Sequence, residues 1–326
     1  MTSTTRHPKN AVRKSLTEWY QLGKVADLIE RLPESHHDKK TLRHIITHAN
    51  PDGCIEAKYQ HGHGIGFGRV YAPHSFQKLT TDVRNIVCND VLIDIDMDNC
   101  YPTIALQTFQ RNGIDTPILK RYVHQRGEII TNIIETHPHM DRDTIKLSFI
   151  VALHNGSYLK HACSSQIPII DAFRIELKQA IKQLTKKPDF IGTFSLAMSR
   201  KDKSNTIGTF ISWCCQIQET LIGAHVCDFI ENRKLVVHCN MFDGFVIQDM
   251  SSQLNQDTGM IKQLLADLSM YIEAETGFIV QFSRKPMTPK PIDDMFSSSD
   301  IPEFQQQDKV VLFDLDGTLA MQTGAI

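Results

Sequence analysis

The 326-residue sequence has no apolar run of the roughly 18 to 20 residues that a membrane-spanning helix needs. Its first residues are polar and lack the apolar stretch of a signal peptide. Proline, at 13 residues, and glycine, at 17, are too scarce for a collagen-like or low-complexity chain. These absences predict an intracellular protein that does not cross a membrane and that folds over most of its length.

The eight cysteines never occur with the CxxC spacing of a zinc ribbon, and their spacings are irregular. Neither a zinc site built on such pairs nor a disulfide framework is therefore indicated. We expect reduced thiols that pack as small apolar side chains.

Net charge is low, at −2, but it is unevenly distributed. Residues 1–290 carry 34 Lys and Arg against 30 Asp and Glu, whereas residues 291–326 carry one against seven. Residues 111–203 carry 15 cations and nine acids, a surplus of six. A basic body is compatible with a polyanionic partner, and a solvated helical surface would explain the same charges.

The periodicity of apolar residues predicts a mixture of helices and short strands. Two helices are expected within 11–48, followed by helices at 102–111, 117–135, 141–153, 167–185, 212–231 and 260–275. Strands are expected at 91–96 and 278–282, and a hairpin at 235–240 and 245–247. This order predicts an α+β fold.

Three aspartates stand where a site would form. Asp94 and Asp96 occupy alternate positions of an apolar strand, so they share one face, and Asp243 lies at the tip of the hairpin. Buried carboxylates repel one another unless a cation compensates them. Mg²⁺ prefers such oxygen ligands, and two ions about 3.5 to 4 Å apart can promote phosphoryl transfer. We therefore expect Asp96 and Asp243 to be catalytic metal ligands, assisted by Asp94.

The string from Asp96 to Ile104, DMDNCYPTI, resembles motif A of template-dependent DNA polymerases, in the D-x-x-S-L-Y-P-S-I form of family B. Asp96, Tyr101 and Pro102 match by position, while Asn99 and Cys100 replace Ser and Leu. The resemblance implies that Asp96 binds both metal ions. It also implies that Tyr101 stacks under the incoming sugar and excludes a 2′-hydroxyl.

Two later strings complete the resemblance. RDTIK, from Arg142 to Lys146, followed by Asn155-Gly156, is similar to motif B of family A and B polymerases, which implies that Arg142, Lys146 and Asn155 contact the nucleotide. Arg142 and Lys146 are four residues apart, which places both cations on one helical face. HCNMFDGF, around Asp243, is similar to motif C, where family B has two aspartates and family A has Asp-Glu. Here Gly244 follows the single acid.

Together these strings imply a polymerase-type palm, a small antiparallel sheet with helices, carrying a helical fingers insertion. The expected organisation is a helical N-terminal region (1–60), a palm (61–290) with fingers at about 105–235, and a linker (291–308). The implied activity is that of a DNA polymerase-like nucleotidyltransferase that extends a primer with Mg²⁺. Its expected partners are a primer-template, nucleoside triphosphates and accessory replication proteins of a virus or mobile element.

Two other readings remain open. An archaeo-eukaryotic-type primase also has an h-D-x-D strand and a later acid, which Asp94, Asp96 and Asp243 would supply, but its S-x-H motif does not occur between Asp96 and Asp243. A non-catalytic nucleic-acid-binding replication protein with a degenerate palm is the third possibility.

The last segment carries a separate signature. VVLFDLDGT, at 310–318, resembles motif I of the haloacid dehalogenase superfamily, in which Asp314 would be the nucleophile and Asp316 the acid-base group. Only eight residues follow Thr318. We expect 309–326 to be a truncated domain without hydrolase activity, or the start of a longer parent chain.

Overall fold

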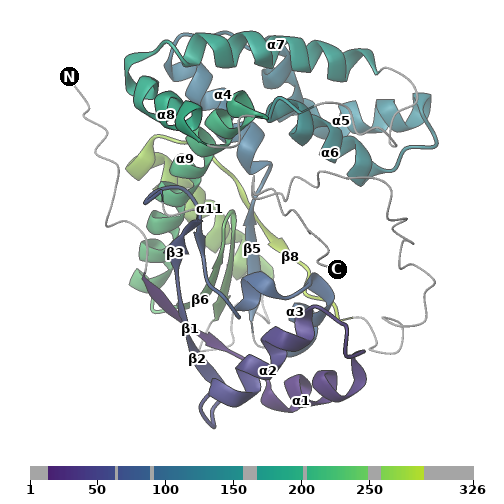
Figure 1. Ribbon diagram of the computed structural model, residues 1–326, viewed down its shortest axis with the longest axis vertical. Helices are drawn as coiled ribbons and strands as arrows, with labels where there is room; N and C mark the ends of the chain where they lie inside the picture. The colour runs from purple at the N-terminus through teal and green to yellow at the C-terminus, as the bar shows by residue number, and fades with distance from the viewer. Residues whose placement is uncertain are drawn as a thin grey trace. The chain divides into compact units, whose positions relative to one another are not determined.

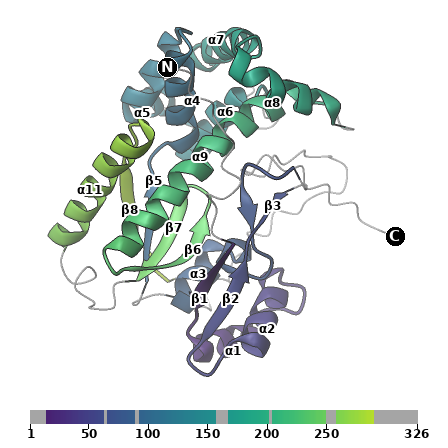
Figure 2. The same ribbon diagram turned by 90° about the vertical axis from the view of Figure 1, so that its left-hand side faces the viewer.

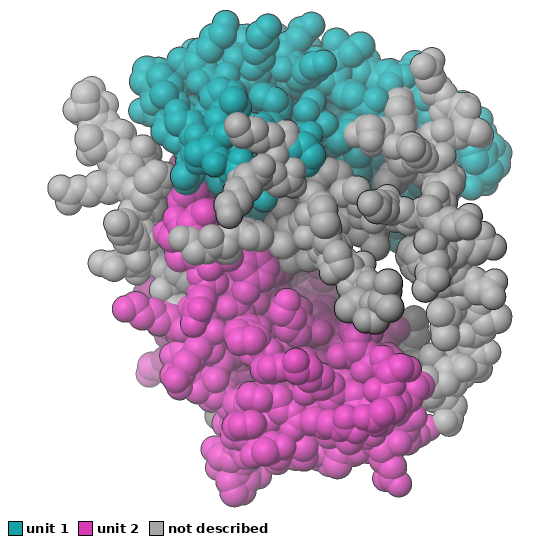
Figure 3. All heavy atoms as spheres, in the orientation of Figure 1, with its two compact units in different colours: residues 1–6, 99–218, 309–326 teal, residues 7–98, 219–308 magenta. Residues whose placement is uncertain are grey.

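The computed structural model describes residues 14–62, 65–88, 92–156, 167–200, 204–248 and 258–289. Two compact units divide these residues (Figure 3). The helical unit is made of the described residues within Asn99–Gln218, and the sheet unit of those within His7–Asp98 and Glu219–Asp308. The expected linker and the dehalogenase-like segment at 309–326 lie outside the described residues.

A four-stranded antiparallel sheet in the order β6-β7-β5-β8 forms the centre of the sheet unit (Figures 1 and 2). Its strands are β5 (Ile93–Met97), β6 (Val236–Met241), β7 (Gly244–Gln248) and β8 (Phe282–Lys285). The predicted strand at 91–96 and the predicted hairpin are therefore present. The strand expected at 278–282 is wrong except at Phe282, because the ladder with β5 starts there, opposite Met97, and continues to Lys285.

The N-terminal part of the sheet unit consists of short elements that pack against this sheet. They are β1 (Ser15–Trp19), α1 (Leu22–Arg31), α2 (Asp38–His48), β2 (Cys54–Lys58), β3 (Gln60–His61), β4 (Val70–Tyr71), the 3-10 helix η2 (Phe76–Lys78) and α3 (Thr81–Cys88). Strands β1 and β2 pair antiparallel, as do β3 and β4. Helix α11 (Thr258–Thr276) follows the hairpin and contacts β8.

The expectation of two helices filling 11–48 is wrong at its beginning, because Ser15–Trp19 is a strand. Leu16 and Glu18 are buried while Thr17 between them is exposed, which is the alternation of a strand. A glutamate on the buried face breaks the apolar pattern by which such a strand is recognised. The spacing of Leu16 and Tyr20 fits a helix as well as it fits the observed structure.

One apolar core joins the N-terminal helices to the sheet. Its members come from α1, α2, η2, α3, β6 and β7, and include Leu28, Leu42, Phe76, Val83 and Val246. Tyr20 stacks on Phe76 with 4.3 Å between ring centroids. The short elements are thus held against the sheet strands that carry the candidate site.

The helical unit contains α4 (Cys100–Arg111), α5 (Pro117–Thr136), α6 (Arg142–Leu153), α7 (Pro168–Leu184), α8 (Pro188–Ser199) and the first part of α9 (Thr206–Asn232). In its core Tyr122 stacks on Phe149, and Phe173 makes edge contacts with both rings. Helix α8 was not expected, because its apolar residues do not keep to one face. Ile191, Leu196 and Met198 are all exposed.

The helices and the small antiparallel sheet confirm the α+β class. Of the helices within the described ranges, none combines the length and the apolar character that a bilayer-spanning segment requires.

Candidate functional site

Strand β5 presents two aspartates on one face of the central sheet. Asp94 and Asp96 are two residues apart, so their side chains lie on the same side of the strand. Asp94 is 5% exposed, and the Asp96 side chain is 17% exposed. Apolar neighbours at Ile93 and Ile95 are fully buried and anchor the strand in the sheet. The strand therefore holds its two acids rigidly, one deep and one at the edge of solvent.

The β6–β7 hairpin brings a third carboxylate to the end of β5. Asp243 occupies the turn, and its carbonyl oxygen accepts a hydrogen bond from the Met97 backbone at 2.9 Å. The residue before it, Phe242, has a φ of +71°, in the left-handed region that non-glycine residues rarely adopt. The turn next to the acid is therefore unusually constrained.

Gly244 accounts for the single acid in this hairpin. It lies directly opposite Asp96 in the β5–β7 ladder. A β-carbon at Gly244 would lie 3.1 Å from Oδ1 of Asp96, tighter than an ordinary contact. Glycine therefore leaves the space that the Asp96 carboxylate occupies.

The three aspartates influence one another electrostatically. Burial, and then the charge of Asp243, raises the pKa of Asp96 to about 7. Burial also raises the pKa of Asp94, and the charge of Asp243 adds to that effect while Lys285 and Arg84 oppose it. Asp243 is thus close enough to Asp96 to disfavour the ionised form of Asp96.

Lys285 is the cation in contact with this cluster. Its Nζ lies 2.8 Å from Oδ1 of Asp96, and its side chain is 53% exposed. Lys285 is the register partner of Asp94 on the edge strand β8. Burial lowers the pKa of Lys285, but its hydrogen bond to Asp96 and the charges of the three acids raise it by more. The ammonium group offsets part of the negative charge.

The donor set fits a divalent cation that prefers oxygen. Oδ1 of Asp94 is buried and, among the described residues, has no hydrogen-bond partner. An unpaired buried carboxylate oxygen costs free energy unless a ligand satisfies it. Carboxylates of this kind are the usual protein ligands of Mg²⁺. Asp94, Asp96 and Asp243 therefore supply the type of donor that such an ion prefers.

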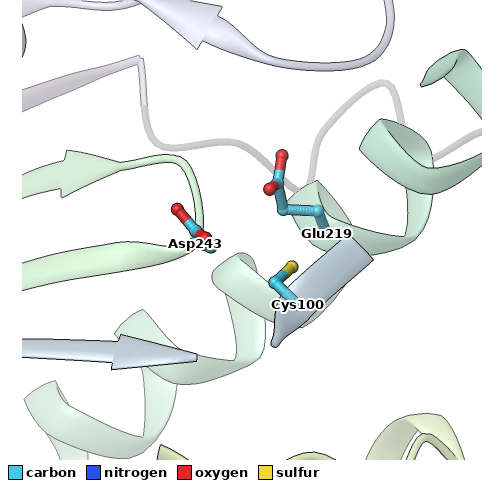
Figure 4. Close-up of side chains that lie close together, drawn as sticks. All are labelled: Cys100, Glu219 and Asp243. Atoms are coloured by element: carbon cyan, nitrogen blue, oxygen red, sulfur yellow. The ribbon is translucent and has the colours of Figure 1, made fainter. Parts of the chain in front are cut away.

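A buried ion pair that no sequence motif indicates lies beside Asp243. Arg69 donates two hydrogen bonds to Glu219, from Nε at 2.6 Å and from Nη2 at 2.8 Å. Glu219, on α9, has a carboxylate oxygen within 4.8 Å of one of Asp243 (Figure 4). The two partners are 150 residues apart, so no local pattern connects them.

The other predicted site residues belong to the helical unit. Tyr101, on α4, is buried and makes an edge contact with His154. Arg142 and Lys146 both lie on α6; Arg142 is exposed, and Lys146 pairs with Asp143 at 2.8 Å.

Asn155 follows α6 with a φ of +55°, and its amide donates to Asn205 at 3.2 Å. The carbonyl of the neighbouring His154 accepts a second bond from Asn205 at 2.8 Å. Asn155 thus has a structural partner in the turn that ends α6. The structure groups Asp94, Asp96 and Asp243 in the sheet unit and Tyr101, Arg142, Lys146 and Asn155 in the helical unit.

Comparison with known proteins gives two likenesses. No family model matches the chain. A protein of the Sputnik virophage, V13, which is named as a candidate helicase, is 24% identical over 303 residues, covering 89% of this chain and 38% of that protein. The chain thus spans well under half of that relative. The POL domain of Pol1 from M. smegmatis, solved with DNA primer-template and dNTP, has a TM-score of 0.47 at 11% identity, covering 76% of this chain and 50% of that one.

Proposed function

We propose that this chain is a template-dependent nucleotidyltransferase, similar to DNA polymerases, that extends a primer strand. The observation that carries the proposal is that two acids from distant parts of the sequence lie on a strand and in the turn beside it. Asp96 on β5 lies opposite Gly244, the residue after Asp243. Such a pair of carboxylates is suited to holding divalent ions around a reacting phosphate.

The sheet unit would provide the metal site. Asp96 and Asp243 would hold Mg²⁺, with the buried oxygen of Asp94 as an additional ligand. Bound there, the metal would activate the attacking hydroxyl and stabilise the charge that develops on the phosphate. Gly244 keeps the space beside Asp96 open. Lys285 is exposed enough to leave Asp96 when a divalent ion binds.

The helical unit would provide nucleotide contacts. Arg142 and Lys146 lie one helical turn apart on α6, an arrangement suited to a triphosphate. Tyr101 would stack on the incoming sugar and exclude a 2′-hydroxyl, and Asn155 would contact the nucleotide as well as its partner Asn205. In such a reaction the protein mainly positions the reactants and stabilises charge.

We further propose that the chain acts in the replication of a virus or mobile element. The similarity to a virophage protein supports this context. Because the chain covers only 38% of that protein, the activity named for it need not reside in the shared region. Accessory proteins, or further segments of a longer parent chain, would then supply functions such as strand separation.

Primer extension with the full chain tests the proposal. We expect Asp96→Asn and Asp243→Asn each to reduce nucleotide incorporation at least about 100-fold while primer-template binding is retained. Asp52→Asn, which removes an exposed acid in a turn of the same unit, is the matched control and should leave incorporation unchanged. Unchanged incorporation in either site variant would remove these residues from the mechanism.

The same assay separates the alternatives. Incorporation on a template without a primer, lost in the same variants, would favour a primase. Nucleic-acid binding with no incorporation by the unmodified chain in Mg²⁺ or Mn²⁺ would overturn the proposal in favour of a binding protein.

A further inference from the structure

The Arg69–Glu219 ion pair is buried, unlike most ion pairs, which lie on the protein surface. The Arg69 side chain is 6% exposed and that of Glu219 is 1% exposed. Removing two charges from water carries a large desolvation cost, and well-packed apolar residues of similar volume often stabilise a fold as well or better. Stability alone is thus a poor explanation for this pair.

The surroundings of Arg69 connect it to the hairpin turn. Its guanidinium lies over the ring of Phe242, 4.4 Å from the ring centroid. Tyr71, two residues further along, contacts the same ring with 5.3 Å between centroids. Asn240 accepts a hydrogen bond from the Phe242 backbone at 2.9 Å. Phe242 is therefore held from several directions in its left-handed conformation.

The segment that carries Arg69 is itself fastened to both α9 and β6. The Gly68 carbonyl accepts a hydrogen bond at 3.1 Å from Thr220, the neighbour of Glu219. Gln77 donates to the carbonyls of Val70, at 3.1 Å, and of Asn240, at 2.6 Å. Arg69 thus sits on a short bridge between the helix and the hairpin.

The charge of Asp243 explains why Glu219 needs Arg69 as its partner. The Glu219 and Asp243 carboxylates are within 4.8 Å, a separation at which two free negative charges disfavour one another. The bidentate Arg69 contact neutralises Glu219 and allows it to lie there. A left-handed Phe242 is strained and persists only when its surroundings enforce it.

We propose that Arg69 and Glu219 are positioning residues for Asp243: the stacked guanidinium fixes Phe242, and so fixes the direction in which the next residue presents its carboxylate to a divalent cation. This inference rests on the proposed metal site. Substituting a group that orients a metal ligand without binding the metal typically reduces metal affinity or activity 10- to 100-fold.

A double variant separates positioning from a structural role. In Arg69→Met/Glu219→Leu both charges are removed together, so no buried charge is left unpaired and the thermal midpoint should stay close to that of the unmodified chain. We nevertheless expect the Kd for Mn²⁺, measured by electron paramagnetic resonance without nucleotide, to rise about 10- to 100-fold. In primer extension, kcat should fall while KM for the primer-template changes little. Normal Mn²⁺ affinity and kcat in a stable double variant would overturn the inference.

Single variants and a matched pair complete the test. Arg69→Lys keeps the charge but loses the bidentate, stacked geometry, so Mn²⁺ affinity should fall between those of the unmodified and double-variant proteins. The exposed bidentate pair of Arg43 and Glu34, at 2.5 and 2.7 Å in the same unit, is the control. Arg43→Gln/Glu34→Gln should leave Mn²⁺ affinity and kcat unchanged.

The outcomes distinguish this inference from the proposed function. Absence of Mn²⁺ binding and incorporation in the unmodified chain would contradict the proposed function itself. An active unmodified chain whose activity and metal affinity survive the double substitution would contradict only the positioning role.

Discussion

Glu18 should make the stability of the protein depend on pH. Its carboxyl group is completely buried between β1 and the hairpin. It accepts hydrogen bonds from the Tyr20 hydroxyl, from the Phe76 backbone at 3.0 Å and from the Tyr59 hydroxyl at 3.4 Å. Cys239, on β6, lies against the same group. Burial outweighs these bonds and raises the pKa of Glu18 from its ordinary 4.5 to about 7.

The sign and size of the effect follow from this shift. The folded state binds a proton at Glu18 more tightly than the unfolded state, so folding stability should fall as pH rises from about 4.5 to 7 and then level off. At about 1.36 kcal/mol for each tenfold change in proton affinity, the loss is about 3 kcal/mol. Burial also raises the pKa of the facing groups, Tyr20, Tyr59 and Cys239, above their ordinary values, so they do not titrate in this range.

The substitution Glu18→Gln isolates the contribution of Glu18 ionisation to the free energy of unfolding. The amide keeps the size of the side chain but cannot ionise, so the difference in unfolding free energy between variant and unmodified protein should change by about 3 kcal/mol between pH 5 and pH 8, in favour of the variant at high pH. Denaturant unfolding at a series of pH values measures it. Parallel stability curves for the two proteins would refute the assignment.

Three further predictions concern the candidate site. Lys285→Met should lower the Kd for Mn²⁺ by no more than about fivefold, because the half-exposed ion pair of Lys285 with Asp96, which the metal must displace, contributes about 1 kcal/mol or less. A higher Kd, measured by electron paramagnetic resonance, would contradict this. Gly244→Ala should reduce kcat about 10- to 100-fold with little change in the thermal midpoint, because its methyl group crowds Asp96; full activity in primer extension would show that the space is not needed. Tyr101→Ala should increase ribonucleotide incorporation at least about tenfold relative to Tyr101→Phe, which keeps the ring; equal sugar selectivity in dNTP and rNTP assays would exclude the gate.

The first half of the candidate site was predictable because its information is local. Side chains at alternate positions of a strand point to the same face, so Asp94 and Asp96 had to share a face once the strand formed. The hairpin was equally readable, since Phe242-Asp243-Gly244 interrupts two apolar runs. Their pairing in one sheet, with Asp96 opposite Gly244, required the structure.

The features that the sequence concealed are those in which a charge is buried. Strand β1 was not predicted because its buried face carries a carboxylate, Glu18, where the strand pattern requires an apolar residue. No local pattern marks Arg69 as buried, because its partner lies 150 residues away in the middle of an apolar helix. Period-based reasoning treats charged residues as markers of the surface, so it fails where a polar group is compensated by tertiary contacts.

These buried charges also explain how the acid cluster is balanced. Three carboxylates, Asp94, Asp96 and Asp243, outnumber the two cations that act on them, Lys285 and Arg84. The neutral Arg69–Glu219 pair adds no net charge, so it can order the turn without occupying the cation position. Burial, and after it the charge of Asp243, raises the pKa values of Asp94 and Asp96, and a further positive charge would oppose both shifts. A divalent cation would supply that charge while leaving the carboxylates ionised, which is the state in which they can serve phosphoryl transfer.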